Sequence, residues 1–487
     1  MDLWICLFLS ALETTIVSTA LRSMSSDLKG LSQSTWVVVA YLLTYNGKYT
    51  ASFQCCLISP RILQTDRHIR SKESTDTVAT DFSRLFNGLR GCPDHDTTVR
   101  IVFRALQGIG ASGIYSIVFV IIGKIGSVEK MPLYMGAITS VFALASLIGP
   151  ILGGIIVNHT TCGPGVALSL LLLIPSIPDL GEKLMDREKL KQVDVIGGIL
   201  SLVWPTLLVF ALEQGGQAYP WQSSIIIGTL VGSVIGFFSF GFYEIRVQRL
   251  GKQEPIVEYS FLLVRVMFTM GGCFYAAIFL LPQRFQAVNG ISAQRAGINL
   301  LPFTIVSPVF SVLCGMLLAK VQKVATMVLV VSSVCTVIGI IMLGTLSSSP
   351  QVFELKTYGF EVILALAAIM GANNTARTLG GCVAVAISSS ILHADLVPSL
   401  RSFLSPNQVE AILTSTLGGP ELTWSEKIKV QEAYGKCYNM QFRALIAFAG
   451  ANLICCLALS IVRYSIERRH KQNVRPSNAA LEIGSGQ

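Results

Sequence analysis

Long apolar runs, separated by short polar segments, extend along most of the chain. The clear runs cover residues 3–22, 101–122, 133–157, 193–212, 224–243, 261–281, 297–319, 324–346 and 441–462. Shorter runs, which are too short to cross a bilayer without tilt, cover residues 36–47, 166–178, 359–370 and 382–393. A helix needs roughly 20 apolar residues to span the hydrocarbon core, so the pattern predicts about thirteen membrane helices.

The composition narrows the class of protein. Hydrophobic residues make up 52% of the 487 residues and charged residues only 13%, against about 25% charged residues in a soluble domain. A β-barrel would show short alternating segments instead, so we expect an all-α polytopic membrane protein. We assign the net charge of +9 to basic loops between helices and not to nucleic-acid binding.

Basic residues set the expected orientation, because cytoplasmic loops are enriched in lysine and arginine. The tail "RYSIERRHKQNVR" and the loops 179–192 and 244–258 fit the cytoplasmic side, whereas "EQGGQAYPWQS" fits the outside. The first helix is expected to remain as a signal anchor. Asn158 begins the sequon Asn-His-Thr on a predicted outer loop, which indicates a glycoprotein.

These features predict a domain organisation. It consists of an N-terminal helical bundle (1–178), a linker with two extra membrane helices (179–258), a C-terminal bundle (259–393), an extracellular loop (394–440), a last membrane helix (441–462) and a cytoplasmic tail (463–487). The amphipathic residues 394–440 are expected to form a solvated helical hairpin, with a substrate lid as the alternative.

The helix expected over residues 101–122 carries a charge and three glycines. Arg104 lies near its start, and Gly108, Gly110 and Gly113 follow. An arginine at the bilayer centre costs about 2.5–3.5 kcal/mol on insertion scales, although snorkelling to the interface relieves part of that cost. Arg104 is therefore either an interfacial residue or a residue that faces a polar cavity, on a helix whose glycines admit a close neighbour.

The stretch "SLIGPILGG", residues 146–154, combines a helix breaker with small residues. Gly149 and Pro150 are expected to bend the helix, and Gly153 and Gly154 remove side-chain bulk below the bend. One interpretation is a packing face of the GxxxG type. The other adds a function, because a kinked and closely packed helix can open or seal a central pathway as two halves rock.

Several of these segments resemble the major facilitator superfamily. "RALQGIGASG" is similar to the motif of its fourth helix, and "SLIGPILGG" to the fifth-helix motif of its antiporters. "LETTIVSTAL" resembles the first-helix motif of the fourteen-helix drug:proton antiporter branch, with Glu13 where aspartate is usual. Other segments that resemble this branch in fungi are "STWVVVAYLLTYNG", "VDVIGGILSLVW", "FALEQGGQAYPW" and "RTLGGCVAVAI".

The resemblance implies a fold and a set of roles. The fold would be two helical bundles plus two extra helices, and the protein a monomeric exporter of small hydrophobic compounds in exchange for protons. Arg104 would take part in proton coupling, Glu13 would lie near the pathway, and Gly149, Pro150, Gly153 and Gly154 would form the antiporter kink. Glu213, Glu361 and Arg377 are further candidates, each with an interfacial anchor as the alternative. The plasma membrane is expected, with the vacuolar membrane as the alternative.

Two windows depart from the family pattern. Residues 48–99 are polar and lack both a third helix and the expected glycine- and arginine-containing loop, and a helix end and a loop are missing at about 366–376. A frameshift or a retained intron changes composition in this way while roughly preserving length. The fold is therefore expected to be incomplete at these windows.

Other functions stay open at this point. One alternative is a non-transporting or defective transporter-like protein, and another is a siderophore or amino-acid permease of the same superfamily. An enzyme is not expected, because the 12 cysteines and 5 histidines show no metal-ligand spacing. No catalytic residue, metal or cofactor is therefore predicted, and no filter segment indicates a channel. The predicted partners are a small-molecule substrate, protons and the lipid bilayer.

Overall fold

The computed structural model describes part of the chain. The described residues are 8, 11–12, 31–45, 101–102, 105, 108, 141, 144–145, 148–149, 195–216, 218–250, 261–320, 325–349, 354–366, 374–414 and 422–484. In these residues the regular secondary structure is helical, and the one bridge, between Gly215 and Tyr219, is isolated. This confirms the predicted all-α class. The anomalous window 48–99 lies outside the described residues.

The helices are long enough to form a membrane bundle. Their bounds are α2 Leu31–Thr44, α9 Val195–Gln214, α10 Ser224–Leu250, α11 Phe261–Val288, α12 Ala293–Asn299, α13 Leu301–Lys320, α14 Ala325–Leu343, α15 Lys356–Ala365, α16 Asn374–Arg401, α17 Pro406–Thr414 and α18 Trp424–Gly484. Within the described ranges, 7 helical segments have the length and hydropathy to cross a membrane.

Helix α16 is much longer than the apolar run 382–393 that predicted it. It spans 28 residues, from Asn374 to Arg401, and continues through Pro398. The apolar run 382–393 is short because the charged Arg377 precedes it, and it contains the polar Ser388. Both side chains are buried against neighbouring helices and not exposed to lipid, so they do not end the helix.

The last helix also extends beyond its predicted limits of 441–462. Helix α18 begins at Trp424, inside the segment expected as a loop, and runs to Gly484, inside the segment expected as a tail. A capping box starts it, because Glu426 accepts a hydrogen bond from the Thr423 amide (2.8 Å) and its own amide donates to the Thr423 hydroxyl (3.4 Å). The segment 394–440 is therefore largely helical, from the end of α16 through α17 into α18.

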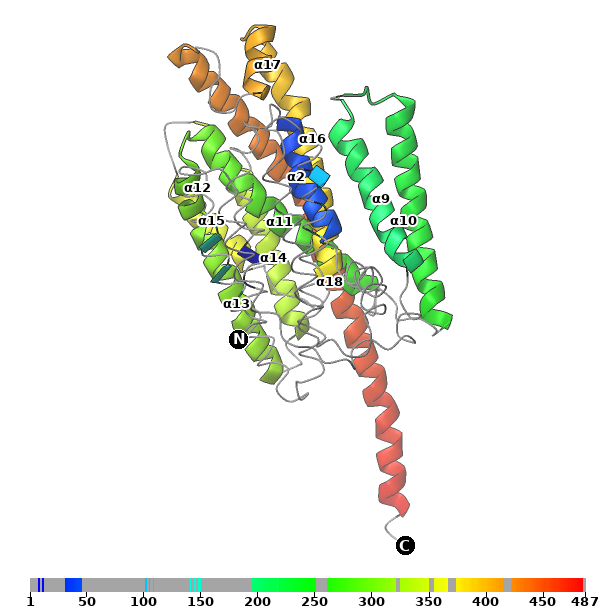
Figure 1. The fold of residues 1–487 in the computed structure, drawn as a ribbon. Helices are drawn as coiled ribbons and strands as arrows, with labels where there is room; N and C mark the ends of the chain where they lie inside the picture. Colours follow the sequence, from blue (N-terminus) through cyan, green and yellow to red (C-terminus); the bar gives the residue numbers. More distant parts are fainter. Residues whose placement is uncertain are drawn as a thin grey trace, which may run out of the picture.

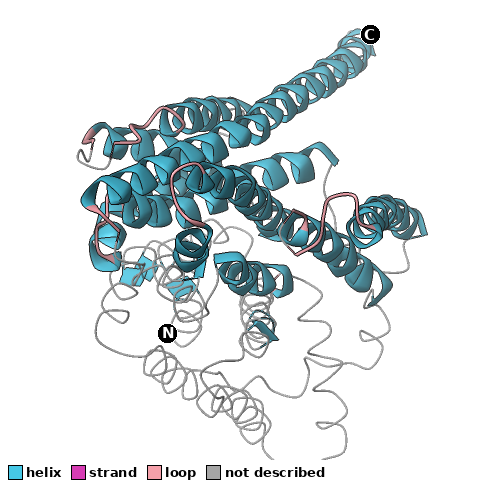
Figure 2. Cartoon of the chain, turned by 90° about the horizontal axis from the view of Figure 1, so that it is seen from above, coloured by secondary structure: helices cyan, strands magenta, loops and turns pink. Residues whose placement is uncertain are grey.

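Helices α11, α16 and α18 pack against one another and form the centre of the described part (Figure 1). Helix α14 packs on this group, chiefly against α18, and α15 lies between α14 and α13. Helices α9 and α10 form a hairpin that lies beside α16. Helix α2 packs against both α16 and α9. Seen from above, the described part consists of helices and short connecting loops, and no strand is drawn in it (Figure 2).

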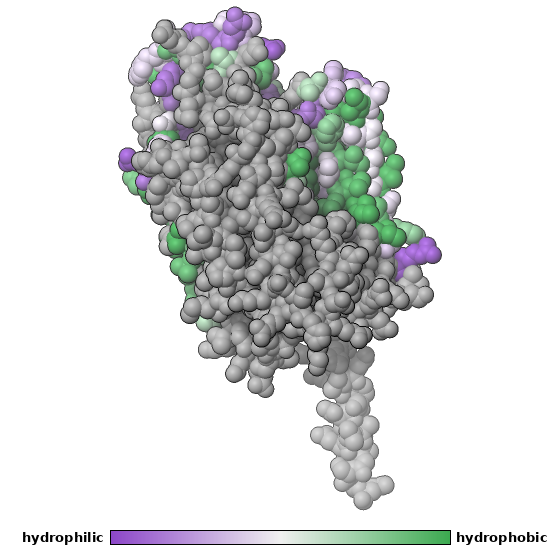
Figure 3. Space-filling view, in the orientation of Figure 1, coloured by the Kyte–Doolittle hydropathy of each residue, from purple (hydrophilic) through white to green (hydrophobic). Residues whose placement is uncertain are grey.

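The hairpin presents a broad apolar surface. The exposed large hydrophobic residues of α10 are Ile225, Ile227, Val231, Val234, Ile235, Phe237, Phe238, Phe242 and Ile245. They form much of the hydrophobic surface over the hairpin in the space-filling view (Figure 3). In a membrane protein such a surface faces lipid, because hydrocarbon is the apolar solvent there. The hairpin is therefore a peripheral element held to the bundle through α9.

Candidate functional site

Many of the predicted functional residues lie outside the described residues. These are Glu13, Arg104, Gly110, Gly113, Pro150, Gly153, Gly154 and Asn158. Gly108 and Gly149 are described, and both are helical and buried. A Cβ atom at Gly108 would meet the Thr44 hydroxyl and, at 2.5 Å, the Tyr41 carbonyl oxygen of α2. Helix α2 thus approaches the backbone at Gly108, as expected of a small residue at a helix contact.

Glu213 lies in the last turn of α9 and faces α16. Its side chain is fully buried, with 0% of its surface exposed. The Ser389 hydroxyl of α16 donates a hydrogen bond to Glu213 Oε2 at 3.0 Å, whereas Oε1 has no hydrogen-bond partner among the described residues. Such burial argues against an interfacial anchor, because an anchor keeps its charge in water.

Glu361 lies in α15, a short helix packed between α13 and α14. It is also 0% exposed; the backbone of Phe303 in α13 is one polar neighbour, but neither carboxylate oxygen makes a hydrogen bond of good geometry in the described part of the bundle. One turn earlier, the Tyr358 hydroxyl donates to Asn299 Oδ1 at 3.1 Å. A carboxyl group with so few polar neighbours is much more stable neutral than ionised.

Arg377 lies in the second turn of α16 and points toward α11. Its guanidinium carbon is 4.1 Å from the centre of the Phe274 ring and 5.7 Å from that of Tyr275. The Arg377 Nε atom has no hydrogen-bond partner among the described residues. Aromatic faces attract a cation electrostatically, so the two rings compensate part of the charge of this buried arginine.

These three charged residues do not form one cluster. Arg377 and Ser389, the partner of Glu213, are twelve positions apart on α16, which corresponds to about 18 Å along a helix. No ion pair joins Glu213, Glu361 or Arg377 to another described residue. Glu213, Glu361 and Arg377 are therefore three separately buried ionisable residues, each with different neighbours.

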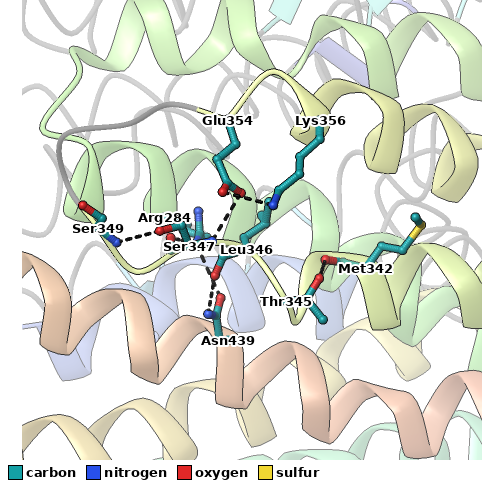
Figure 4. A network of polar contacts seen from close by, with 9 residues as sticks. All are labelled: Arg284, Met342, Thr345, Leu346, Ser347, Ser349, Glu354, Lys356 and Asn439. Carbon is teal, nitrogen blue, oxygen red and sulfur yellow. Dashed lines mark hydrogen bonds and ion pairs between the residues drawn. The ribbon is translucent and has the colours of Figure 1, made fainter.

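Sequence reasoning missed a fourth buried charge, Arg284, near the end of α11. Its Nη2 atom donates to the Ser347 carbonyl oxygen at 2.8 Å and to Asn439 Oδ1 at 3.4 Å (Figure 4). Asn439 of α18 in turn donates to the Leu346 carbonyl oxygen at 2.6 Å. Glu354 accepts from the Ser347 amide at 3.3 Å and pairs with Lys356 at 3.0 Å. This network ties α11 and α18 to the connection between α14 and α15.

A signal for Arg284 was available in the sequence. The predicted span 261–281 ended just before Pro282, because proline usually ends a helix. Helix α11 continues through Pro282, so Arg284 belongs to the same helix and is buried. The buried amides Gln441 and Asn452 of α18 were missed for a related reason. Each is a polar residue within the predicted apolar run 441–462, and each binds across a helix interface, Gln441 to the Ser388 carbonyl oxygen and Asn452 to the Thr269 hydroxyl.

Known proteins resemble this chain over most of its length. The sequence profile of the Major Facilitator Superfamily matches residues 91–385. The MFS-type transporter FPY5 of Fusarium mangiferae is 33% identical over 511 residues, which cover 94% of this chain and 82% of FPY5. The MFS-type efflux pump MFS1 of Arthroderma benhamiae is 27% identical and covers 86% of this chain, with 75% of MFS1 aligned.

A solved structure resembles the fold. It is a bacterial homologue of the human lysosomal transporter Spinster in an inward-facing, unoccupied conformation, with a TM-score of 0.50 and 14% sequence identity. The likeness covers 93% of this chain and 95% of the homologue. At this identity it bears on the fold alone.

Proposed function

Because the chain belongs to the Major Facilitator Superfamily, a family of membrane transporters and not of enzymes, we propose that it exports small apolar organic compounds in exchange for protons. The relative MFS1 carries the name of an efflux pump, which supports export as the direction of transport. Apolar compounds fit the chemistry of a bundle whose buried surface is largely aliphatic and aromatic. The plasma membrane is the proposed location, since export there removes a compound from the cell.

Proton coupling rests on one observation, the buried carboxyl of Glu361, which has no counter-ion and no hydrogen bond of good geometry among the described residues. An ionised carboxylate inside a membrane bundle is costly unless it has a partner, so this group binds a proton in the conformation described. If the opposite conformation admits water to Glu361, the carboxyl can release that proton on the other side. A group that alternates in this way carries a proton across the membrane.

The sequence motifs add the remaining parts of this proposal. Glu13 and Arg104 are proposed as the coupling pair of the N-terminal bundle, and Arg377 as a buried positive charge of the C-terminal one. The segment Gly149–Gly154 is proposed as the kink that lets the two bundles rock about the substrate. The transporter is proposed to act as a monomer and to carry a glycan at Asn158.

The test is export driven by a proton gradient in proteoliposomes that contain the purified chain. We expect uphill export of an apolar dye by the wild-type chain and none by Arg104→Ala, because the coupling charge is removed. Arg246→Ala removes an exposed arginine of α10 and serves as the control, with wild-type export expected. Export by Arg104→Ala at the wild-type rate would contradict the assignment of Arg104.

The same assay separates the proposed function from its alternatives. Uptake or exchange of a ferric siderophore or a basic amino acid, in place of the dye, would favour a permease. A folded wild-type chain that transports none of these compounds would favour a transporter-like protein without transport.

A further inference from the structure

The contact between the α9–α10 hairpin and α16 contains an acidic group that a purely structural contact does not need. Glu213 is the only charged residue of α9, whose other side chains are apolar, small or neutral polar. Helix α9 packs against α10, α16 and α2, and Glu213 lies where it meets α16. An apolar residue of similar size would bury as well there without the cost of desolvating a carboxyl group.

Titratable groups on the elements packed against α9 leave Glu213 without a counter-ion. Those of α16 are Arg377, Cys382, His393, Asp395 and Arg401, those of α10 are Tyr243, Glu244, Arg246 and Arg249, and α2 contributes Tyr41 and no charged residue. No cation among the described residues lies within 4.0 Å of the Glu213 carboxylate. His393 is linked to it indirectly, because its Nδ1 atom lies 3.0 Å from the carbonyl oxygen of Ser389.

We propose that Glu213 is a proton-binding site that holds the hairpin on α16 when protonated and loosens it when ionised. This proposal rests on the proposed proton-coupled transport. It adds a further proton-binding site to the coupling residues Glu13, Arg104 and Glu361. With the hairpin seated, the Glu213 carboxyl is neutral and accepts the Ser389 hydroxyl. When α16 moves and water enters, the carboxyl gives its proton to that water, and the remaining carboxylate stays hydrated.

The arrangement explains why the partner is a serine. A hydroxyl donates to either form of the carboxyl, so it positions Glu213 without fixing its charge. An arginine or lysine at this position would hold the carboxylate ionised throughout the transport cycle. Helix α16 also packs on α2, α11 and α18, so a change at Ser389 is transmitted to the centre of the bundle.

The first experiment reads the proton directly and does not depend on transport. Infrared difference spectra of the purified full chain in lipid nanodiscs, taken across a pH titration, detect the C=O band of each protonated carboxyl. We expect Glu213→Gln to lose one such band at neutral pH and Ser389→Ala to shift its frequency, because the hydrogen bond is lost. Glutamine keeps the shape and still accepts from Ser389, so the variant folds. Glu432→Gln on α18 is the control and leaves the band in place.

The second experiment tests the coupling. Dye export by Glu213→Gln in proteoliposomes is expected to lose the pH dependence of the wild-type chain, while Glu432→Gln keeps it. An unchanged infrared spectrum in Glu213→Gln would overturn the protonation site. A lost band together with wild-type pH dependence of export would overturn the coupling. If the wild-type chain exports nothing, the proposed function fails, whereas the infrared result still decides whether Glu213 holds a proton.

Discussion

Helices α10 and α11 are both long and apolar and both contain glycines, yet Gly228 and Gly241 of α10 have surroundings opposite to those of Gly271 in α11. A Cβ atom at Gly228 or Gly241 of α10 would meet nothing within 4 Å. A Cβ atom at Gly271 of α11 would meet the Arg377 carbonyl oxygen of α16, and one at Gly380 of α16 would meet the Phe268 carbonyl oxygen of α11. The same residue type therefore marks open surface at Gly228 and Gly241, and a backbone-to-backbone crossing at Gly271. Gly236 of α10 is a third case, because a Cβ atom there would lie 2.9 Å from the Cβ atom of Trp204 in α9.

One arginine pair and one threonine pair of the two helices differ in a similar way. Arg284 of α11 is buried and bonded to the α14–α15 connection and to α18, whereas Arg246 of α10 is exposed. Both threonine hydroxyls can donate within their own helix, Thr269 to the Arg265 carbonyl oxygen and Thr229 to that of Ile225, each at 2.9 Å. The Thr269 hydroxyl of α11 also lies 3.3 Å from Asn452 Oδ1 of α18, an acceptor on another helix. Paired substitutions in the two helices test whether the loss of stability depends on burial and not on residue type.

The largest difference is expected for the glycines. Gly271→Leu forces α11 and α16 apart, because a side chain there has no space beside the α16 backbone, and the cost is more than about 3 kcal/mol. Gly228→Leu adds a side chain on the lipid side, and wild-type stability is expected. Thermal unfolding of the purified variants in detergent measures both. Equal melting temperatures would show that the α11–α16 crossing is less close than described.

A smaller loss is expected for the arginines. Arg284→Ala removes a charged donor from two acceptors, and hydrogen bonds to charged groups contribute about 1.5–3 kcal/mol each. We expect a melting temperature well below that of the wild-type chain, with Arg246→Ala unchanged. Arg284→Lys restores the charge but not the forked geometry, so an intermediate melting temperature is expected. A stable Arg284→Ala variant would mean that the network of Figure 4 does not hold α11 and α18 together.

The smallest effect is expected for the threonines. Thr269→Val removes the hydroxyl that reaches Asn452 and keeps the side-chain shape. Hydrogen bonds between membrane helices contribute about 0.6 kcal/mol on average, so a slight decrease in stability is expected. Thr229→Val is the matched change on α10, where no decrease is expected. Denaturation of the two variants under the same conditions measures the difference in stability. A larger loss of stability in Thr229→Val than in Thr269→Val would contradict this prediction.

Helix positions were well predicted where the apolar pattern is long and continuous. The runs 193–212, 224–243 and 324–346 correspond to α9, α10 and α14 within a few residues at most ends, because helices in lipid must satisfy their backbone internally and so follow hydropathy closely. The pattern failed at α16 and α18, whose buried or water-exposed polar residues lower the local hydropathy while the helix continues.

The candidate charges were predicted in part. Glu213, Glu361 and Arg377 were recognised because a charge beside an apolar run is rare. Hydropathy does not distinguish an interfacial anchor from a residue buried against a neighbouring helix. The two differ only in whether the side chain faces water or another helix. The partners Ser389, Phe274 and Asn439 are on helices far along the chain, and no local signal connects them to their charged neighbours.

The sequence by itself determined the class, the family likeness and the approximate helices, because hydropathy and short motifs are local properties. Tertiary structure alone decided that Gly271 lies at a helix crossing while Gly228 lies on open surface. It also decided that Glu213, among the described residues, meets a hydroxyl and not a cation. The physical reason is that burial and hydrogen bonding are properties of pairs of helices, and the pairing is set by how the whole bundle packs.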